Sequence, residues 1–291
     1  MPTDRPLRLG RRVFDDGQPL VMAIVNRTPD SFYDRGATYA EDAALDRIAQ
    51  AIEEGADIVD IGGVKAGYGP EVDAAEEIRR VASFVARVRG DHPDLVISVD
   101  TWRAEVGRVV CGEGVDLLND AWGGHDPGLV DVAAEFGAAI VCTHTGGLRP
   151  RTDPHRMEYD DVVAAALEAT LGYAERARAA GVPEASIVID PAHDFGKNTH
   201  HSLELTRRLG EMVATGWPVL VSLSNKDFVG ETLGRPTAER LPGTLAATAA
   251  CALAGARIFR AHQVRETRDV VDMAYAIAGR RLPERAIRGL A

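Results

Sequence analysis

The sequence predicts a (β/α)8 (TIM) barrel that is preceded by a small β-hairpin. Short apolar runs alternate along the chain with longer segments of helical period. The runs are continuous stretches of Val, Ile, Leu and Ala, which is typical of parallel strands buried on both faces. The chain has 291 residues, close to the usual length of such a barrel. The predicted strands span residues 20–25, 57–61, 95–99, 115–118, 138–142, 186–189, 219–223 and 257–259.

The segments between these runs have the pattern of amphipathic helices. In the first of them, Leu45, Ile48 and Ile52 follow the spacing i, i+3, i+7 that lines one helix face. Each predicted strand is followed by such a segment and the composition does not shift along the chain. We therefore expect residues 1–291 to form one barrel domain rather than an open doubly wound sheet. The predicted helices span residues 42–54, 74–89, 103–111, 129–136, 159–180, 202–214, 243–254 and 265–278.

A short segment before the first strand predicts the hairpin. Residues 7–15 are followed by Asp16 and Gly17, and an Asp-Gly pair favours a tight turn. We expect this hairpin to close the bottom of the barrel, which is the end where the strands begin.

Charge and cysteine content exclude several classes of function. The formal net charge is −11, which argues against nucleic acid or an anionic membrane surface as the main partner. Cys111, Cys142 and Cys251 are widely spaced, and a sparse, odd set of cysteines suits a reducing compartment. The amino terminus lacks the apolar core of a signal peptide, and no apolar run is long enough to span a membrane. We therefore expect a cytoplasmic protein.

Polar side chains follow nearly every predicted strand, at the place where the strand ends. In a (β/α)8 barrel the carboxyl ends of the strands and the loops after them form the active site. Because the strand ends converge, a ligand site is expected there. The polar residues at these ends are Asn26, Asp100, Asn119, His144, Asp190, Ser224, Lys226, Arg260 and His262.

The chemistry of these side chains predicts a site with two parts. The first comprises Asp100, Asn119, Asp190 and Lys226, which suit a pterin or guanine edge that both donates and accepts hydrogen bonds. In the second, residues from the last strand and the neighbouring first strand cluster, and the guanidinium beside an imidazole at the end of the last strand suits a phosphate or pyrophosphate. This second part comprises Arg260, His262 and Asn26, whose amide oxygen is also a candidate ligand for Mg²⁺.

Several ordered motifs make the chain resemble dihydropteroate synthases from the first strand to the last. The motifs are residues 26–32 (NRTPDSF), 60–63 (DIGG), 98–101 (SVDT), 118–120 (LND), His144, 190–191 (DP) with 195–197 (FGK), 224–230 (SNKDFVG) and 260–262 (RAH). Together they are far more specific than any one of them.

This resemblance implies a reaction and a set of roles. The family condenses 6-hydroxymethyl-7,8-dihydropterin pyrophosphate with p-aminobenzoate and releases pyrophosphate. A homodimer formed through the last helices and a Mg²⁺ ion on the pyrophosphate, held in part by Asn26, are also implied. The implied substrate contacts are Asn26, Thr28, Asp30, Phe32, Asp100, Asn119, Asp190, Ser224, Lys226, Arg260 and His262. Catalytic roles are implied for Asp100, as stabiliser of the pterin cation, and for Lys226, Arg260 and His262.

The departures from the family pattern concentrate in the loop after the second strand. Where the family has an acidic residue and Ser-Thr-Arg-Pro, residues 64–70 read VKAGYGP, so the hydroxyl and the guanidinium that close over the second substrate are missing. Smaller changes are Arg27 in the first loop, Asn225 in place of Arg, Ala192-His193-Asp194 in place of a Gly-rich run, and Gln263 in place of an acidic residue. Lys65 and Arg27 are candidates to replace part of the lost charge.

These departures favour a divergent paralogue that keeps the pterin and pyrophosphate pocket but has weak or no synthase activity. Such a protein would bind p-aminobenzoate or sulfonamide-type analogues only weakly. Two alternatives within the family are an active synthase with a remodelled loop and an enzyme that joins another nucleophile to the same pterin. Two rivals from other classes are a methyltetrahydrofolate-binding methyltransferase module and a non-catalytic regulator of folate metabolism. The residues 28–32, Arg260 and His262 favour the synthase branch over the methyltransferase.

Overall fold

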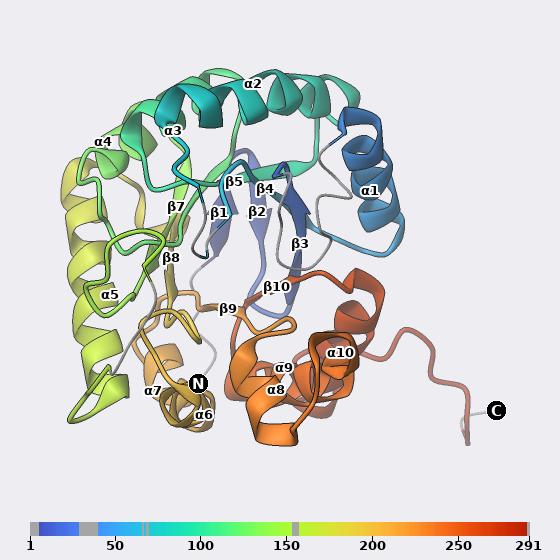
Figure 1. Cartoon of the computed structure of the whole chain (residues 1–291). Helices are drawn as coiled ribbons and strands as arrows, with labels where there is room; N and C mark the ends of the chain where they lie inside the picture. The colour runs from blue at the N-terminus through green and yellow to red at the C-terminus, as the bar shows by residue number, and fades with distance from the viewer. Residues whose placement is uncertain (1–5, 29–39, 66, 68–69, 153–156, 290–291) are drawn as a thin grey trace.

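The computed structural model describes residues 6–28, 40–65, 67, 70–152 and 157–289. Eight parallel strands surround a central axis in the order β8-β7-β6-β5-β4-β3-β10-β9 (Figure 1). A parallel bridge between Ile189 and Val219 joins the two edge strands and completes the barrel. Every strand lies within two residues of its predicted bounds, so the predicted (β/α)8 barrel is confirmed. The strands are β3 (Leu20–Asn26), β4 (Ile58–Gly62), β5 (Val96–Asp100), β6 (Leu117–Asp120), β7 (Ala139–Thr143), β8 (Ile187–Asp190), β9 (Leu220–Ser222) and β10 (Ile258–Ala261).

The helices surround the strands on the outside of the barrel (Figure 1). Three differ from the prediction. Helix α5 begins at Val162 rather than at residue 159, because the Asp161 side chain accepts hydrogen bonds from the first backbone N–H groups and caps the helix. The segment predicted as one helix over 202–214 is divided into α6 and α7 at Arg208, and α8 follows β9 without having been predicted. The helices are α1 (Glu41–Glu53), α2 (Ala74–Asp91), α3 (Ala104–Gly112), α4 (Leu129–Phe136), α5 (Val162–Ala180), α6 (Thr199–Arg207), α7 (Leu209–Val213), α8 (Asp227–Leu233), α9 (Leu241–Ala254) and α10 (Val264–Ile277).

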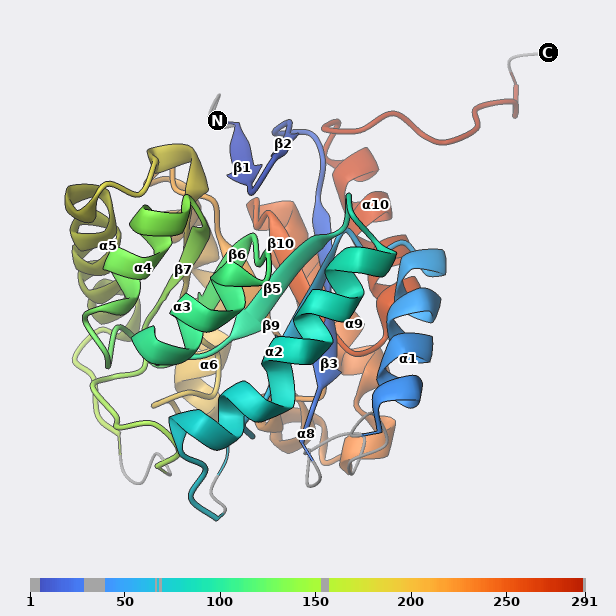
Figure 2. The same ribbon diagram turned by 90° about the horizontal axis from the view of Figure 1, so that it is seen from above.

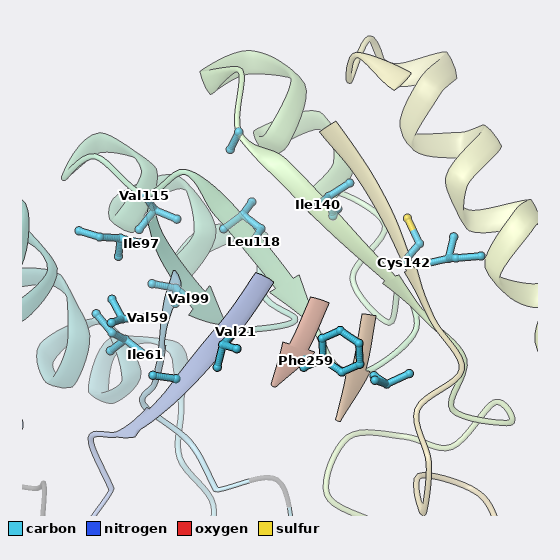
Figure 3. Close-up of a cluster of buried hydrophobic side chains, with 14 of the residues drawn as sticks. Val21, Val59, Ile61, Ile97, Val99, Val115, Leu118, Ile140, Cys142 and Phe259 are labelled. Atoms are coloured by element: carbon cyan, nitrogen blue, oxygen red, sulfur yellow. The ribbon is translucent and has the colours of Figure 1, made fainter. Parts of the chain in front are cut away.

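Side chains of each strand alternate between the helices and the barrel axis, as a strand requires. Outward residues such as Val21, Val59 and Leu118 form a continuous apolar cluster between the strands and the helices (Figure 3). This cluster attaches the helices to the barrel. The inward residues of the same strands are left to fill the interior.

The interior changes from apolar to polar along the strands. Near the strand starts, residues such as Ile58, Val188 and Ile258 pack together in a dry inner cluster. Two positions further along the same strands, the inward residues are Asp60, Asp190 and Arg260. The polar end of the barrel is therefore the end at which the strands finish.

The β-hairpin closes the other end, as predicted. Strands β1 (Leu7–Leu9) and β2 (Arg12–Phe14) pair in an antiparallel manner and lie at the end of the barrel opposite the carboxyl end of β3 (Figure 2). Leu7, Leu9 and Phe14 are buried in the inner cluster.

The position of the hairpin turn differs from the prediction. The strands are joined at Gly10, which adopts φ 56°, a conformation that favours glycine. Asp16 and Gly17 instead lie in a turn after the hairpin, where the backbone N–H of Gln18 donates to the carbonyl of Asp15 at 3.1 Å. The Asp-Gly pair therefore redirects the chain into β3.

In the described part of the chain, no helix combines the length and the apolar character needed to cross a membrane.

The closure of the barrel by the hairpin can be tested by truncating Leu9, which is 0% exposed. Leu9→Ala is expected to lower the free energy of unfolding by about 2–5 kcal/mol, because it leaves a cavity in the barrel floor. Urea denaturation followed by circular dichroism measures this. The matched control is Val13→Ala on the same hairpin, where the side chain is 61% exposed and the expected change is within about 0.5 kcal/mol. Equal losses in the two variants would contradict the proposed packing.

Candidate functional site

A cavity of about 320 Å³ opens at the carboxyl ends of the strands. Most of the predicted site residues line it, although they come from separate strands and loops. These residues are Asn26, Thr28, Asp100, Asn119, Asp190, Ser224, Lys226, Arg260 and His262. Asp30 and Phe32 lie outside the described residues. The structure thus brings together both predicted parts of the site.

At the floor of the cavity, one arginine is shared between two carboxylates. Arg260 Nε donates to Asp60 Oδ2 at 2.6 Å, and its Nη2 donates to Asp100 Oδ2 at 3.0 Å. Asp60 also accepts hydrogen bonds from Ser98 Oγ at 2.6 Å and from Asn119 Nδ2 at 3.1 Å. It therefore holds three neighbouring side chains in the orientation that the cavity requires.

Asp60 was not among the predicted site residues. It lies inside β4, two residues before the strand ends, whereas the predicted site residues are those at the strand ends. Its position in the Asp-Ile-Gly-Gly motif was the available signal. Because its side chain is fully buried, Asp60 supports the site from below.

The shared guanidinium leaves Asp100 in an unusual electrostatic environment. Burial raises the pKa of Asp100 to about 7, and the negative charge of Asp60 adds to this rise while Arg260 opposes it. Two buried carboxylates thus compete for one cation. The carboxyl group of Asp100 therefore keeps its proton to a higher pH than an ordinary aspartate does.

The loop after β8 holds Lys226 in place. Lys226 Nζ donates to the backbone carbonyl of His193 and lies 4.4 Å from the centre of the Phe195 ring. Burial lowers the pKa of Lys226, although Asp194 and Asp190 oppose that shift. Lys226 and Asp190 both line the cavity.

Asp194 connects this loop to helix α8. Its Oδ2 accepts hydrogen bonds from the backbone N–H groups of Asp227 at 2.6 Å and Phe228 at 3.3 Å, which are the first residues of α8. Its other oxygen, Oδ1, accepts from Ser202 Oγ at 3.0 Å. Asp194 thus replaces a glycine-rich run with a side chain that caps the helix following Lys226. The residue types at this place indicate the loss of the Gly-rich run, but they do not predict that Asp194 caps α8.

The second part of the site contains a neutral histidine. Ser224 Oγ and His262 Nδ1 form a hydrogen bond of 2.9 Å. Burial lowers the pKa of His262 to about 3, and the charges of Arg260 and Arg47 contribute to the shift. At neutral pH the imidazole is therefore uncharged, and Arg260 supplies the positive charge at this end.

Val64, the first residue of the altered loop after β4, forms part of an apolar wall of the cavity. Val64 packs with Trp102 and Trp122 in a small buried cluster, against which Phe195 also packs. Trp122 also lines the cavity. At the first position of this loop, where the family pattern has an acidic residue, the chain presents the hydrocarbon side chain of Val64.

The two cations predicted to replace the lost charge behave differently. Lys65 lines the cavity. The guanidinium carbon of Arg27 lies 4.7 Å from the centre of the Phe84 ring, which belongs to the cluster between the strands and the helices. The prediction that Arg27 could substitute in the site is therefore wrong, because position 27 alternates outward from Asn26.

Comparisons with known proteins agree with this geometry. A family model described as pterin binding enzyme matches residues 22–262. A Mycobacterium leprae protein named inactive dihydropteroate synthase 2 is 57% identical over 290 residues, covering 97% of this chain and 98% of the relative. The crystal structure of Yersinia pestis dihydropteroate synthase with a sulfonamide drug complex has a TM-score of 0.89 and 32% identity, covering 95% of this chain and 100% of the other. A Coxiella burnetii dihydropteroate synthase in complex with pteroic acid has a TM-score of 0.84 and 29% identity, covering 94% of this chain and 98% of the other.

Competition between the two carboxylates predicts a measurable change in the pKa of Asp100. In Asp60→Asn the pKa of Asp100 is expected to fall below 7, because the neighbouring negative charge is gone while Arg260 remains, although burial still raises it. A carbon NMR titration of the aspartate carboxyl groups measures it. The matched control is Asp94→Asn, an exposed carboxylate at the other end of the barrel, which should leave the midpoint unchanged.

The same shift predicts the direction of the pH dependence of stability. The unfolded Asp100 ionises near its ordinary value of 3.8, whereas the folded one keeps its proton to about 7. The folded state therefore binds more protons between these values, and the contribution of Asp100 to stability falls as the pH rises through 7.

For the NMR titration of Asp60→Asn, an unchanged midpoint of Asp100 would refute the shared-guanidinium explanation.

Proposed function

The chain belongs to the pterin-binding enzyme family, and we propose that it binds a pterin in the barrel while catalysing dihydropteroate synthesis weakly or not at all. The observation that carries the proposal is the contrast between the two walls of one cavity. The wall formed by Asp100, Asn119 and Asp190 offers hydrogen-bond donors and acceptors that suit the edge of a polar heterocycle. The wall formed by the loop after β4 offers the side chain of Val64, packed among tryptophans.

Pterin binding is supported by the charge and burial of its proposed partners. Asp190 is buried, which raises its pKa, and its Oδ1 already accepts the backbone N–H of Ala192 at 2.7 Å. The other oxygen, Oδ2, is the proposed acceptor for the N–H donors of a heterocycle. Lys226, beside it, is a donor for a ring carbonyl or nitrogen. A pterin has donors and acceptors on one edge, so both demands are met by one ligand.

The pyrophosphate is proposed to lie at the end formed by Arg260, His262 and Asn26. The guanidinium supplies charge there, and the neutral imidazole can donate one hydrogen bond. Such charge and hydrogen bonds stabilise a departing pyrophosphate more than a bound one, because the leaving group gains negative charge.

Mg²⁺ fits this end only as an ion shared with the pyrophosphate. Among the described residues no group of three or more His, Cys, Asp or Glu side chains could hold a metal by itself. Mg²⁺ keeps several waters and commonly binds through few protein oxygens plus substrate phosphates. The amide oxygen of Asn26, which lines the cavity, is the proposed protein ligand, and the ion would neutralise part of the leaving-group charge.

We expect weak or no turnover because of the residues in the loop after β4 that would contact the second substrate. A loop hydroxyl and a loop guanidinium that act in the transition state each contribute about two orders of magnitude in rate. Lys65 offers a point charge, but it does not reproduce a bidentate fork. The Mycobacterium leprae relative is named inactive, in agreement with this proposal. We therefore expect p-aminobenzoate and sulfonamide-type analogues to bind weakly.

Two further properties belong to the proposal. The first is a homodimer, supported by the exposed apolar side chains of Met273 and Ile277 on α10, which are 61% and 66% exposed. The second is a cytoplasmic location, supported by the buried and unpaired state of all three cysteines.

Replacing the central carboxylate tests pterin binding. Asp190→Asn is expected to weaken binding of 6-hydroxymethyl-7,8-dihydropterin pyrophosphate by about 10- to 100-fold, because it removes a charged hydrogen-bond acceptor. Isothermal titration calorimetry with and without Mg²⁺ measures the affinity. Asp131→Asn, an exposed carboxylate on α4, is the control and should bind as the unaltered protein does. If the unaltered protein shows no binding of the pterin, the proposed function is wrong.

Grafting the family loop tests the reason for weak turnover. We expect the unaltered chain, at saturating p-aminobenzoate, to turn over more than about tenfold slower than an ordinary synthase. Placing an acidic residue and Ser-Thr-Arg-Pro at residues 64–68 should raise the rate, because it restores the missing hydroxyl and guanidinium. A coupled assay of pyrophosphate release measures both. Turnover by the unaltered chain within tenfold of an ordinary synthase would contradict the proposal.

A further inference from the structure

The side chain of Thr143 carries a buried hydroxyl group that lacks a hydrogen-bond partner among the described residues. It is the last residue of β7, it is 3% exposed, and it lines the cavity. Its Oγ1 is buried and has no hydrogen-bond partner among the described residues. A buried hydroxyl without a partner is unfavourable, so such a group normally bonds to a ligand or to water.

The position of Thr143 on the barrel wall identifies its neighbours. Strand β7 lies between β6 and β8, and Thr143 is in register with Asp190. On the other side, Asn119 is in register with Val141, the inward residue one level lower on β7. Along the wall the order is therefore Asn119, Thr143, Asp190 and then Lys226, which follows β9.

This order of groups matches the order of polar atoms on a pterin edge. That edge presents in sequence the acceptor N1, the donor 2-amino group, the donor N3–H and the acceptor 4-oxo group. Asn119 Nδ2 donates one hydrogen to Asp60 and keeps a second donor for N1. Asp190 accepts from N3–H, and Lys226 donates to the 4-oxo group.

We propose that Thr143 is a specificity-determining residue whose hydroxyl accepts a hydrogen bond from the exocyclic 2-amino group of the pterin. This inference rests on the proposed pterin binding and adds to it a residue and an atom. The amino group has two hydrogens, so it can donate to Thr143 and to Asp190 together. The site would therefore prefer 2-amino heterocycles over analogues without that group.

A calorimetric cycle with two ligands and two residues tests the assignment. The ligands are pterin (2-aminopteridin-4-one) and pteridin-4-one, which differ only in the amino group, and the variant is Thr143→Val. Thr143→Val is expected to bind pterin about three- to tenfold more weakly, because it loses one hydrogen bond. It should bind pteridin-4-one with the affinity of the unaltered protein. Thr143→Ser, which keeps the hydroxyl, should retain most of the affinity for pterin.

A second buried threonine provides the control. Thr170 on α5 donates to the carbonyl of Ala166 at 2.7 Å and does not line the cavity. Thr170→Val should leave both affinities unchanged, and circular dichroism of all variants should show the same folded state.

The possible results separate this inference from the proposed function. If the unaltered protein binds pterin and Thr143→Val binds it equally well, water satisfies the hydroxyl and the inference fails alone. If Thr143→Val loses the same factor for both ligands, the hydroxyl contacts another atom and the assignment is overturned. If the unaltered protein does not bind pterin, the proposed function fails.

Discussion

In a closed barrel of parallel strands, only every second residue of a strand faces the axis, and the site depends on this constraint. Each strand can contribute few inward side chains, and its last one faces the cavity. In this chain the inward series begins with residues such as Ile58 and ends with groups such as Asp60, so one barrel holds a dry floor and a polar mouth. The hairpin completes the floor because Leu7 and Leu9 fill the open lower end. Water is thereby kept from the lower side of the ion-pair network.

The network of Asp60, Asp100 and Arg260 is the electrostatic consequence of that enclosure. Removing three charges from water is costly unless they are paired and hydrogen-bonded, and Asp60 is bonded to Ser98, Asn119 and Arg260. One guanidinium between two carboxylates leaves an excess of negative charge. A ligand that donates N–H groups to the carboxylates of this network reduces the excess. The floor therefore favours the amino and ring N–H groups of a heterocycle.

The two walls of the cavity differ in the hydrogen-bonding groups that they present to a ligand. On the side of β7 and β8, the Thr143 hydroxyl lacks a partner among the described residues and Asp190 lines the cavity, so a polar ligand edge suits this wall. On the side of the loop after β4, Val64 needs no partner because the tryptophans already pack against it. The proposed pterin would need only the first wall. A second substrate would have to be held by the apolar wall and Lys65, which cannot fix its orientation as a bidentate cation would.

Much of this protein was predictable from the sequence, because strand periodicity and strand ends are local properties. Continuous apolar runs located the strands within two residues, and the polar residue after each run identified Asn119, Asp190 and Arg260. The loss of the second-substrate loop was also visible directly, since it is a change of residue types at one place.

Only the tertiary structure decided which side chains meet, because alternation and loop geometry act across distant segments. It placed Asp60 beneath the site, although it lies inside a strand, and turned Arg27 outward onto Phe84. It located the hairpin turn at Gly10, where a positive φ is required. It also left the hydroxyl of Thr143 without a partner beside Asp190, which no pattern of residues along the chain could have indicated.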